Sequence, residues 1–91
     1  MEEEFFIISF ESTHYAMLVE NKLKEAELKV NLIPTPRIIT ASCGLSLKID
    51  SDVMEDVSKA LKSYDLDATM FQIYRVIKNG NENKAIPINI H

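Results

Sequence analysis

The single cysteine of this 91-residue chain lies in the segment best suited to chemistry. Cys43 stands between Ser42 and Gly44, within the proline- and glycine-bearing segment 34–44. A thiolate is a nucleophile, and nearby cations or the N–H groups at a helix start lower its pKa. Arg37 in the same segment offers such a cation, and Gly44 leaves space beside the sulfur for a bulky partner. The segment therefore has the residues of a reactive-cysteine site.

A second set of polar residues, Glu11–His14, lies at the start of the first predicted helix. Ser12 or Thr13 can accept a hydrogen bond from the free N–H groups of that helix. His14 on the first turn can act as a base or as a hydrogen-bond donor, whereas the charge of Glu11 would oppose a thiolate. His14 and Cys43 resemble a nucleophile–base pair, but no third residue that would orient them can be identified in the sequence.

Each of these residues also has a plain structural explanation. A lone cysteine in a small domain is often a buried apolar residue, Arg37 can be a solvated loop residue, and His14 can be a surface or capping residue. The position of Cys43 in a long loop favours reactivity, because long loops in compact domains tend to be functional. Both interpretations of Cys43 remain open at this point.

Composition argues against several other classes of site. A net charge of −4 and a pI near 5.1 leave no excess of Lys and Arg for phosphate, so neither nucleic acid nor an anionic membrane is an expected partner. Two histidines, one cysteine and two glycines provide neither metal-ligand spacing nor a phosphate-binding loop, so no metal and no cofactor is expected. One cysteine cannot form an intrachain disulfide. The acidic start Glu2–Glu4 is unlike a secretory signal, and the apolar run Phe5–Phe10 is too short to span a membrane, so we expect a cytoplasmic domain.

Hydrophobic patterning predicts four strands and two helices. The predicted strands are apolar runs or strict alternations: 5–10, 28–32, 45–49 and 70–76. The predicted helices have an apolar stripe at helical spacing: 13–26 and about 53–64. Ser51 or Asp52, with Glu55 in a capping box, would begin the second helix. The weak alternation of Ile86–Ile90 predicts either an edge strand or a docking tail.

This order of elements predicts an α+β, ferredoxin-like βαββαβ domain over residues 1–78, followed by a tail over 79–91. Two helices would cover one face of a four-stranded antiparallel sheet in the spatial order 4-1-3-2. The first and third strands are then neighbours, so Cys43 and Gly44 should lie beside Glu11–His14. The first strand is apolar on both faces, so an open alternative is an assembly unit that forms a homodimer through the uncovered face or through the tail.

Two loop motifs resemble those of a small family of selenium/sulfur carrier-like proteins, formerly a bacterial domain of unknown function. The matching segments are Leu32–Arg37 and Ser42–Leu45, preceded by Phe10 and by the helix start Ser12–His14. The resemblance covers about residues 5–76 and leaves the tail outside.

The resemblance implies a small carrier protein and not an enzyme. Cys43 would hold sulfur or selenium as a persulfide or selenosulfide and pass it between donor and acceptor proteins by thiol exchange. The resemblance also implies supporting roles: Arg37 for the anion, Ser42 and Gly44 for the turn, and Thr13 and His14 for the helix side. The alternative is a non-catalytic binding or regulatory module for a small anion or a partner protein, with a structural Cys43.

Overall fold

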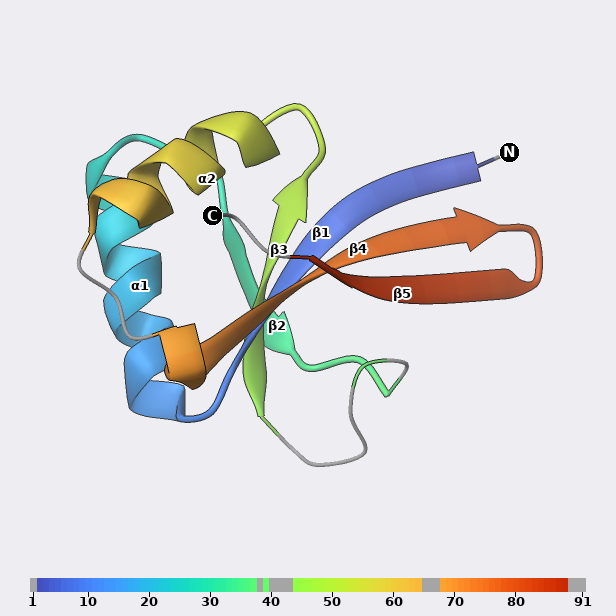
Figure 1. The fold of residues 1–91 in the computed structure, drawn as a ribbon, viewed down its shortest axis with the longest axis horizontal. Helices are drawn as coiled ribbons and strands as arrows, with labels where there is room; N and C mark the ends of the chain where they lie inside the picture. The colour runs from blue at the N-terminus through green and yellow to red at the C-terminus, as the bar shows by residue number, and fades with distance from the viewer. Residues whose placement is uncertain (1, 38, 40–43, 65–67, 89–91) are drawn as a thin grey trace.

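The computed structural model describes residues 2–37, 39, 44–64 and 68–88, which form an α+β domain (Figure 1). Five antiparallel strands form one sheet in the order β2-β3-β1-β4-β5. The elements in chain order are β1 (Glu2–Phe10), α1 (Thr13–Glu25), β2 (Asn31–Pro34), β3 (Leu45–Asp50), α2 (Met54–Ser63), a short 3-10 helix (Ala68–Met70), β4 (Phe71–Asn79) and β5 (Glu82–Ile88).

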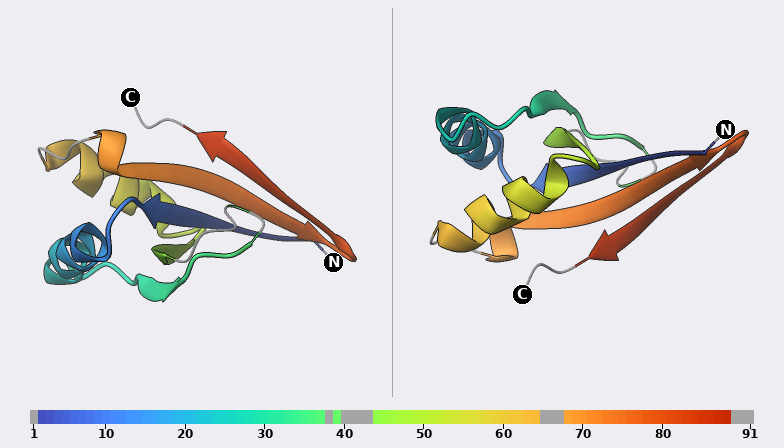
Figure 2. Two further views of the ribbon diagram at one scale, coloured as in Figure 1. Left: turned by 90° about the horizontal axis from the view of Figure 1, so that it is seen from below. Right: turned by 90° about the horizontal axis from the view of Figure 1, so that it is seen from above.

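The central strand is β1, which pairs with β3 on one side and with β4 on the other. Ile7 and Ile8 point to opposite faces and are both fully buried, which agrees with the apolar pattern on both sides of this strand. The strand begins earlier than predicted, because Glu2–Glu4 continue the pairing with Ile77–Asn79 of β4. Figure 2 accordingly shows the start of β1 beside the turn of the β4–β5 hairpin, away from the helices.

The sheet has five strands and not four. The tail 79–91, in which Ile86–Ile90 was predicted to be either an edge strand or a docking tail, contributes the edge strand β5, whose residues Glu82–Ile88 pair along β4. Gly80 adopts a left-handed backbone (φ 63°) in the tight turn that joins the two strands, a conformation that glycine adopts without strain. The predicted division at residue 78 falls near the end of β4.

Both helices pack on one face of the sheet, which we call the helix face. Its core joins Ile8, Leu47, Ile49 and Ile73 of the sheet to buried residues of the helices: Val19, Leu23, Met54, Val57 and Leu61. Figure 1 shows both helices on the same side, with the β4–β5 hairpin extending away from them. This is the arrangement that the amphipathic stripes predicted.

The opposite face, which we call the loop face, carries Phe5 and Ile7 of β1. This second cluster is buried within one chain: Phe5 is 6% exposed, Ile7 is 0% exposed, and the cluster packs against Ile33, Ile39, Tyr74 and Ala85. The predicted homodimer was meant to cover these residues, and the structure covers them without a second chain. A homodimer therefore stays a prediction, but the need to cover this face of β1 no longer supports it.

The start of α1 is fixed by Ser12, whose side-chain oxygen accepts a hydrogen bond from the Tyr15 N–H at 3.1 Å. The predicted cap of α2 is wrong: Val53 is the N-cap residue and makes no side-chain capping bond. The Val53 N–H instead donates to the Asp50 carbonyl at 3.0 Å, so a backbone turn precedes α2 and places Ser51 and Asp52 before the cap position.

Replacing Ser12 by alanine should lower the free energy of unfolding by about 1 kcal/mol, since the Tyr15 N–H loses its acceptor. Thr13→Ala is the matched control, because Thr13 is exposed and begins the helix without acting as its cap. Urea unfolding of both variants measures the difference. Equal losses in the two variants would contradict the capping role of Ser12.

Candidate functional site

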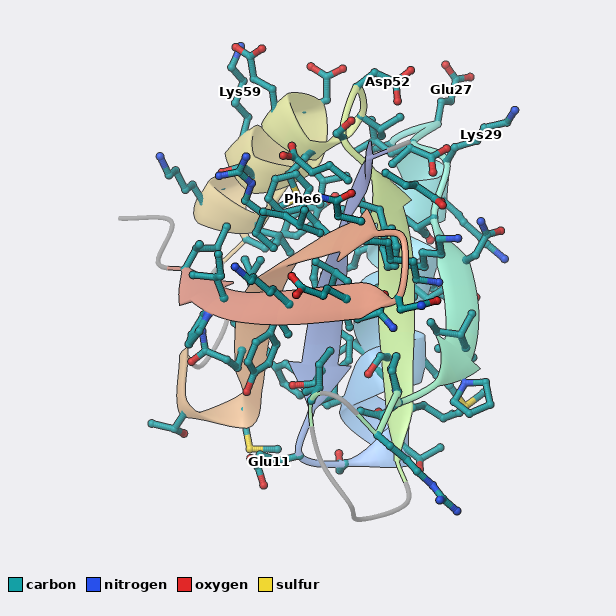
Figure 3. The ribbon with its side chains drawn as sticks, turned by 90° about the vertical axis from the view of Figure 1, so that its right-hand side faces the viewer. Phe6, Glu11, Glu27, Lys29, Asp52 and Lys59 are labelled. Atoms are coloured by element: carbon teal, nitrogen blue, oxygen red, sulfur yellow. The ribbon has the colours of Figure 1, made fainter. Side chains whose placement is uncertain are left out.

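A cleft of about 340 Å³ opens on the loop face, at the end of the sheet where β1 finishes and α1 begins. Figure 3 shows Glu11 at this end of the molecule and Asp52 and Glu27 at the other end. Most of the cleft lining is polar and uncharged, and Glu11 is its one charged residue among those described. The lining residues are Ser9, Phe10, Glu11, Ser12, Thr13, Thr35, Ile39, Gly44, Gln72 and Tyr74.

The strand side of the cleft is set by the register between β1 and β4. Ser9 lies opposite Gln72, and Ile7 lies opposite Tyr74, so the side chains of Ser9, Gln72 and Tyr74 share the loop face. The Gln72 side-chain N–H group donates to the carbonyls of Ile73 (3.0 Å) and Ile88 (3.2 Å). The Gln72 amide is therefore held in one orientation by β4 itself and by β5.

The loop side of the cleft is closed by hydrogen bonds at the base of the segment 36–43. The Thr35 N–H donates to the Gly44 carbonyl at 2.9 Å, which continues the pairing of β2 with β3. The Thr35 hydroxyl also lies 2.6 Å from the Ser46 hydroxyl, and Ser46 is fully buried. These two contacts fix where the segment leaves and rejoins the sheet.

Two of the predicted site residues line the cleft. Thr13 contributes the first residue of α1, and Gly44 precedes β3, so the helix start and the segment that follows Cys43 meet as the strand order predicted. A Cβ at Gly44 would lie 3.6 Å from the Thr35 hydroxyl oxygen, an ordinary contact. The described surroundings therefore do not require glycine at this position on steric grounds.

Two further predicted residues, Arg37 and His14, do not line the cleft. Arg37 is exposed, in a turn that the Ile39 N–H closes on the Pro36 carbonyl at 3.0 Å, and it does not line the cleft. His14 is exposed on the first turn of α1 and does not line the cleft either. Cys43 and Ser42 lie outside the described residues.

Among the cleft residues that sequence reasoning did not single out are Thr35, Gln72 and Tyr74. Thr35 lies between two prolines in the Leu32–Arg37 segment, which was used for the family resemblance, and was assigned no role of its own. The alternation of Gln72 and Tyr74 with Ile73, which is buried on the helix face, was the available signal, since it puts these polar side chains on the face away from the helices.

Thr35→Val should lower the free energy of unfolding by about 1–3 kcal/mol, because the Ser46 hydroxyl would remain buried without its partner. Adding Ser46→Ala should then cost less than the sum of the two single changes, since neither hydroxyl is left behind. Chemical unfolding of the four proteins in a double-mutant cycle measures the coupling. Strict additivity would show that the two hydroxyls do not interact.

Within the part of the chain that the structure describes, no group of three or more His, Cys, Asp or Glu side chains is placed to hold a metal ion. Neither described helix has the length and apolar character needed to cross a membrane. The uncharged groups around the cleft are hydrogen-bond donors and acceptors. They suit a small polar ligand or the reacting atoms of a thiol exchange.

These features define a small α+β domain with a polar cleft between a helix N-terminus and the glycine that follows its only cysteine. Over residues 5–75 the sequence matches the family described as "Putative Se/S carrier protein-like", and the chain belongs to that family. The resemblance noted from the loop motifs is confirmed. The matched region ends within β4, so β5 lies beyond it. Comparison with curated proteins and with solved structures gave no match.

Proposed function

We propose that the chain carries a sulfur or selenium atom on Cys43 and hands it from a donor protein to an acceptor protein. The observation that carries the proposal is the position of Gly44. The residue next to Cys43 in the sequence lines a polar cleft together with Ser12 and Thr13 at the N-terminus of α1. The carrier description of the family supports the same role.

For sulfur, loading is a thiol exchange that needs no external oxidant. The Cys43 thiolate attacks the outer sulfur of a donor persulfide, the donor S–S bond breaks, and the donor leaves as its thiolate. Unloading repeats the step with an acceptor thiolate and regenerates the Cys43 thiolate. The protein ends each cycle unchanged, which is the behaviour of a carrier without turnover of its own.

The helix N-terminus supplies partial positive charge on the cleft side, which favours an anionic sulfur there. Glu11 lines the same cleft and opposes that charge. Proposed supporting roles follow the family pattern: Arg37 for the persulfide anion, Ser42 and Gly44 for the turn, and Thr13 and His14 for the helix side. We also keep the ferredoxin-like assignment for β1 to β4, which the strand order supports.

Mass spectrometry of the intact reduced protein tests the proposal. After incubation with glutathione persulfide and removal of the donor, the chain should gain the mass of one sulfur atom. For selenium the donor is selenodiglutathione, from which the Cys43 thiolate displaces one glutathione thiolate at the selenium atom. The expected product therefore carries selenium and the remaining glutathionyl group.

Both products should be lost on reduction with dithiothreitol. Protein alkylated at Cys43 beforehand is the control and should gain neither mass. No gain from either donor, together with slow alkylation of Cys43 at neutral pH, would overturn the proposal and leave Cys43 as a structural thiol.

A further inference from the structure

A second cavity, of about 350 Å³, opens on the loop face and shares no lining residue with the cleft beside Gly44. Its floor is apolar and comes from β1, β2 and β4, whereas its polar groups are two ammonium groups and one amide. The lining residues are Phe5, Ile33, Pro36, Lys48, Val76, Lys78 and Asn83. This volume lies within the range of about 300–1,000 Å³ that is usual for small-molecule sites.

The two lysines approach the same aromatic ring from the two strands that flank β1. The Nζ atom of Lys48, on β3, lies 4.6 Å from the centre of the Phe5 ring, and that of Lys78, on β4, lies 5.5 Å from it. Strand β1 lies between β3 and β4 in the sheet, so the Phe5 ring is within reach of both cations. Each ammonium group gains from the ring's negative π-face, which holds both at the cavity.

Neither lysine has a carboxylate partner among the described residues. The ion pairs there are Lys24–Glu20, Lys59–Glu55 and Arg75–Glu4. Glu3 stands opposite Lys78 in the β1–β4 register, yet no ion pair joins them. In a chain with a net charge of −4, two lysines that share a cavity without an acidic partner form a local site for a negative charge.

From this juxtaposition we infer that the cavity binds a small organic anion with an apolar body. The apolar part packs on Phe5, Ile33 and Val76, and the carboxylate, sulfonate or phosphate group accepts charge-assisted hydrogen bonds from Lys48 and Lys78. The apolar floor favours such a ligand over an inorganic ion, which would leave that floor uncovered. The inference does not depend on Cys43, because the cavity is built from other residues.

A pair of fluorescent probes with the same aromatic rings tests the inference. Anilinonaphthalene sulfonate is an organic anion, and N-phenylnaphthylamine has its rings without the charge. The folded protein should bind the anionic probe at one saturable site, with an affinity at least about ten-fold higher than its affinity for the neutral probe. In amide NMR spectra the shifts should cluster at Phe5, Val76 and Asn83 and leave α2 unchanged.

Lys48→Gln and Lys78→Gln should each weaken binding of the sulfonate about three- to five-fold, and the double variant about ten-fold or more. The matched control is Lys62→Gln, an exposed lysine of α2 on the helix face, which should bind like the wild type. Circular dichroism checks that all variants are folded.

Unchanged affinity in the double variant, equal binding of the two probes, or NMR shifts that cluster at the cleft beside Gly44 would overturn the inference. If the double lysine variant binds the sulfonate more weakly but loads sulfur on Cys43 as the wild type does, this site is supported independently of the carrier proposal. Competition by inorganic phosphate at millimolar concentration should be weak. Strong competition would contradict the requirement for an apolar body.

Discussion

The Cys43→Ser variant is expected to release no sulfide after exposure to a persulfide donor, whereas the wild type should release about one sulfide per chain on reduction. The effect should be complete, because the sequence contains no other thiol that could hold a sulfane sulfur. The donor is removed by desalting, dithiothreitol is added, and the released sulfide is measured.

Thr13→Ala is the companion variant, because Thr13 lines the cleft but has no sulfur. It should keep most of the sulfide release, since the backbone N–H groups of the α1 N-terminus remain. Sulfide release from folded Cys43→Ser protein at the wild-type level would mean that the sulfur is held elsewhere, and the proposed carrier site would be wrong.

Leu47→Ala is expected to give the largest loss of stability that we predict, about 2–5 kcal/mol. Leu47 is fully buried in β3, pairs with Ile8 of β1 and with Leu32 of β2, and belongs to the core on which both helices pack. Its truncation would remove apolar contacts from the helix face and leave a cavity there. Urea unfolding followed by circular dichroism measures the change.

Leu18→Ala is the matched control for this prediction. Leu18 belongs to α1 but is 41% exposed, so the same truncation should change the free energy of unfolding by no more than about 0.5 kcal/mol. A similar loss in the two variants would contradict the core assigned to the helix face.

The elements predicted well were those for which two local signals agreed. The α1 helix was predicted over 13–26 and is observed over Thr13–Glu25, because the Ser12 cap and the apolar stripe both favour it. The strand predicted over 28–32 was displaced to Asn31–Pro34. Glu27 adopts a left-handed backbone (φ 63°), and the Leu28 N–H donates to the Leu23 carbonyl, so these residues end the helix.

Tertiary contacts account for the errors in the extents of β1 and β5. Strand β1 begins at Glu2 because pairing with β4 provides hydrogen-bond partners for its backbone, although glutamate has a low strand propensity. The edge strand β5 covers Glu82–Ile88 and so begins before the weak alternation at Ile86, for the same reason. Local sequence patterns reflect the conformational preferences of side chains, but they contain no information on the length of the neighbouring strand.

Part of the candidate site followed from topology alone. The first and third strands were predicted to be adjacent in the sheet, and their pairing in the structure brings Gly44 to the helix start at Ser12 and Thr13. The contributions of Gln72 and Tyr74 depend on the β1–β4 register, which the sequence did not specify. The cavity with Lys48 and Lys78 depends on three strands at once and was not predicted. The assignment of Cys43 as the carrier residue stays a prediction.

The most direct test of the carrier account is a single handoff between purified molecules. Wild-type protein loaded with one sulfur atom and freed of donor is mixed with an excess of an alkylatable acceptor thiol, and both partners are weighed by mass spectrometry. The account predicts that the protein returns to its unloaded mass with Cys43 free while the acceptor gains one sulfur atom. A loaded protein that keeps its sulfur in the presence of the acceptor thiol would contradict carriage by Cys43.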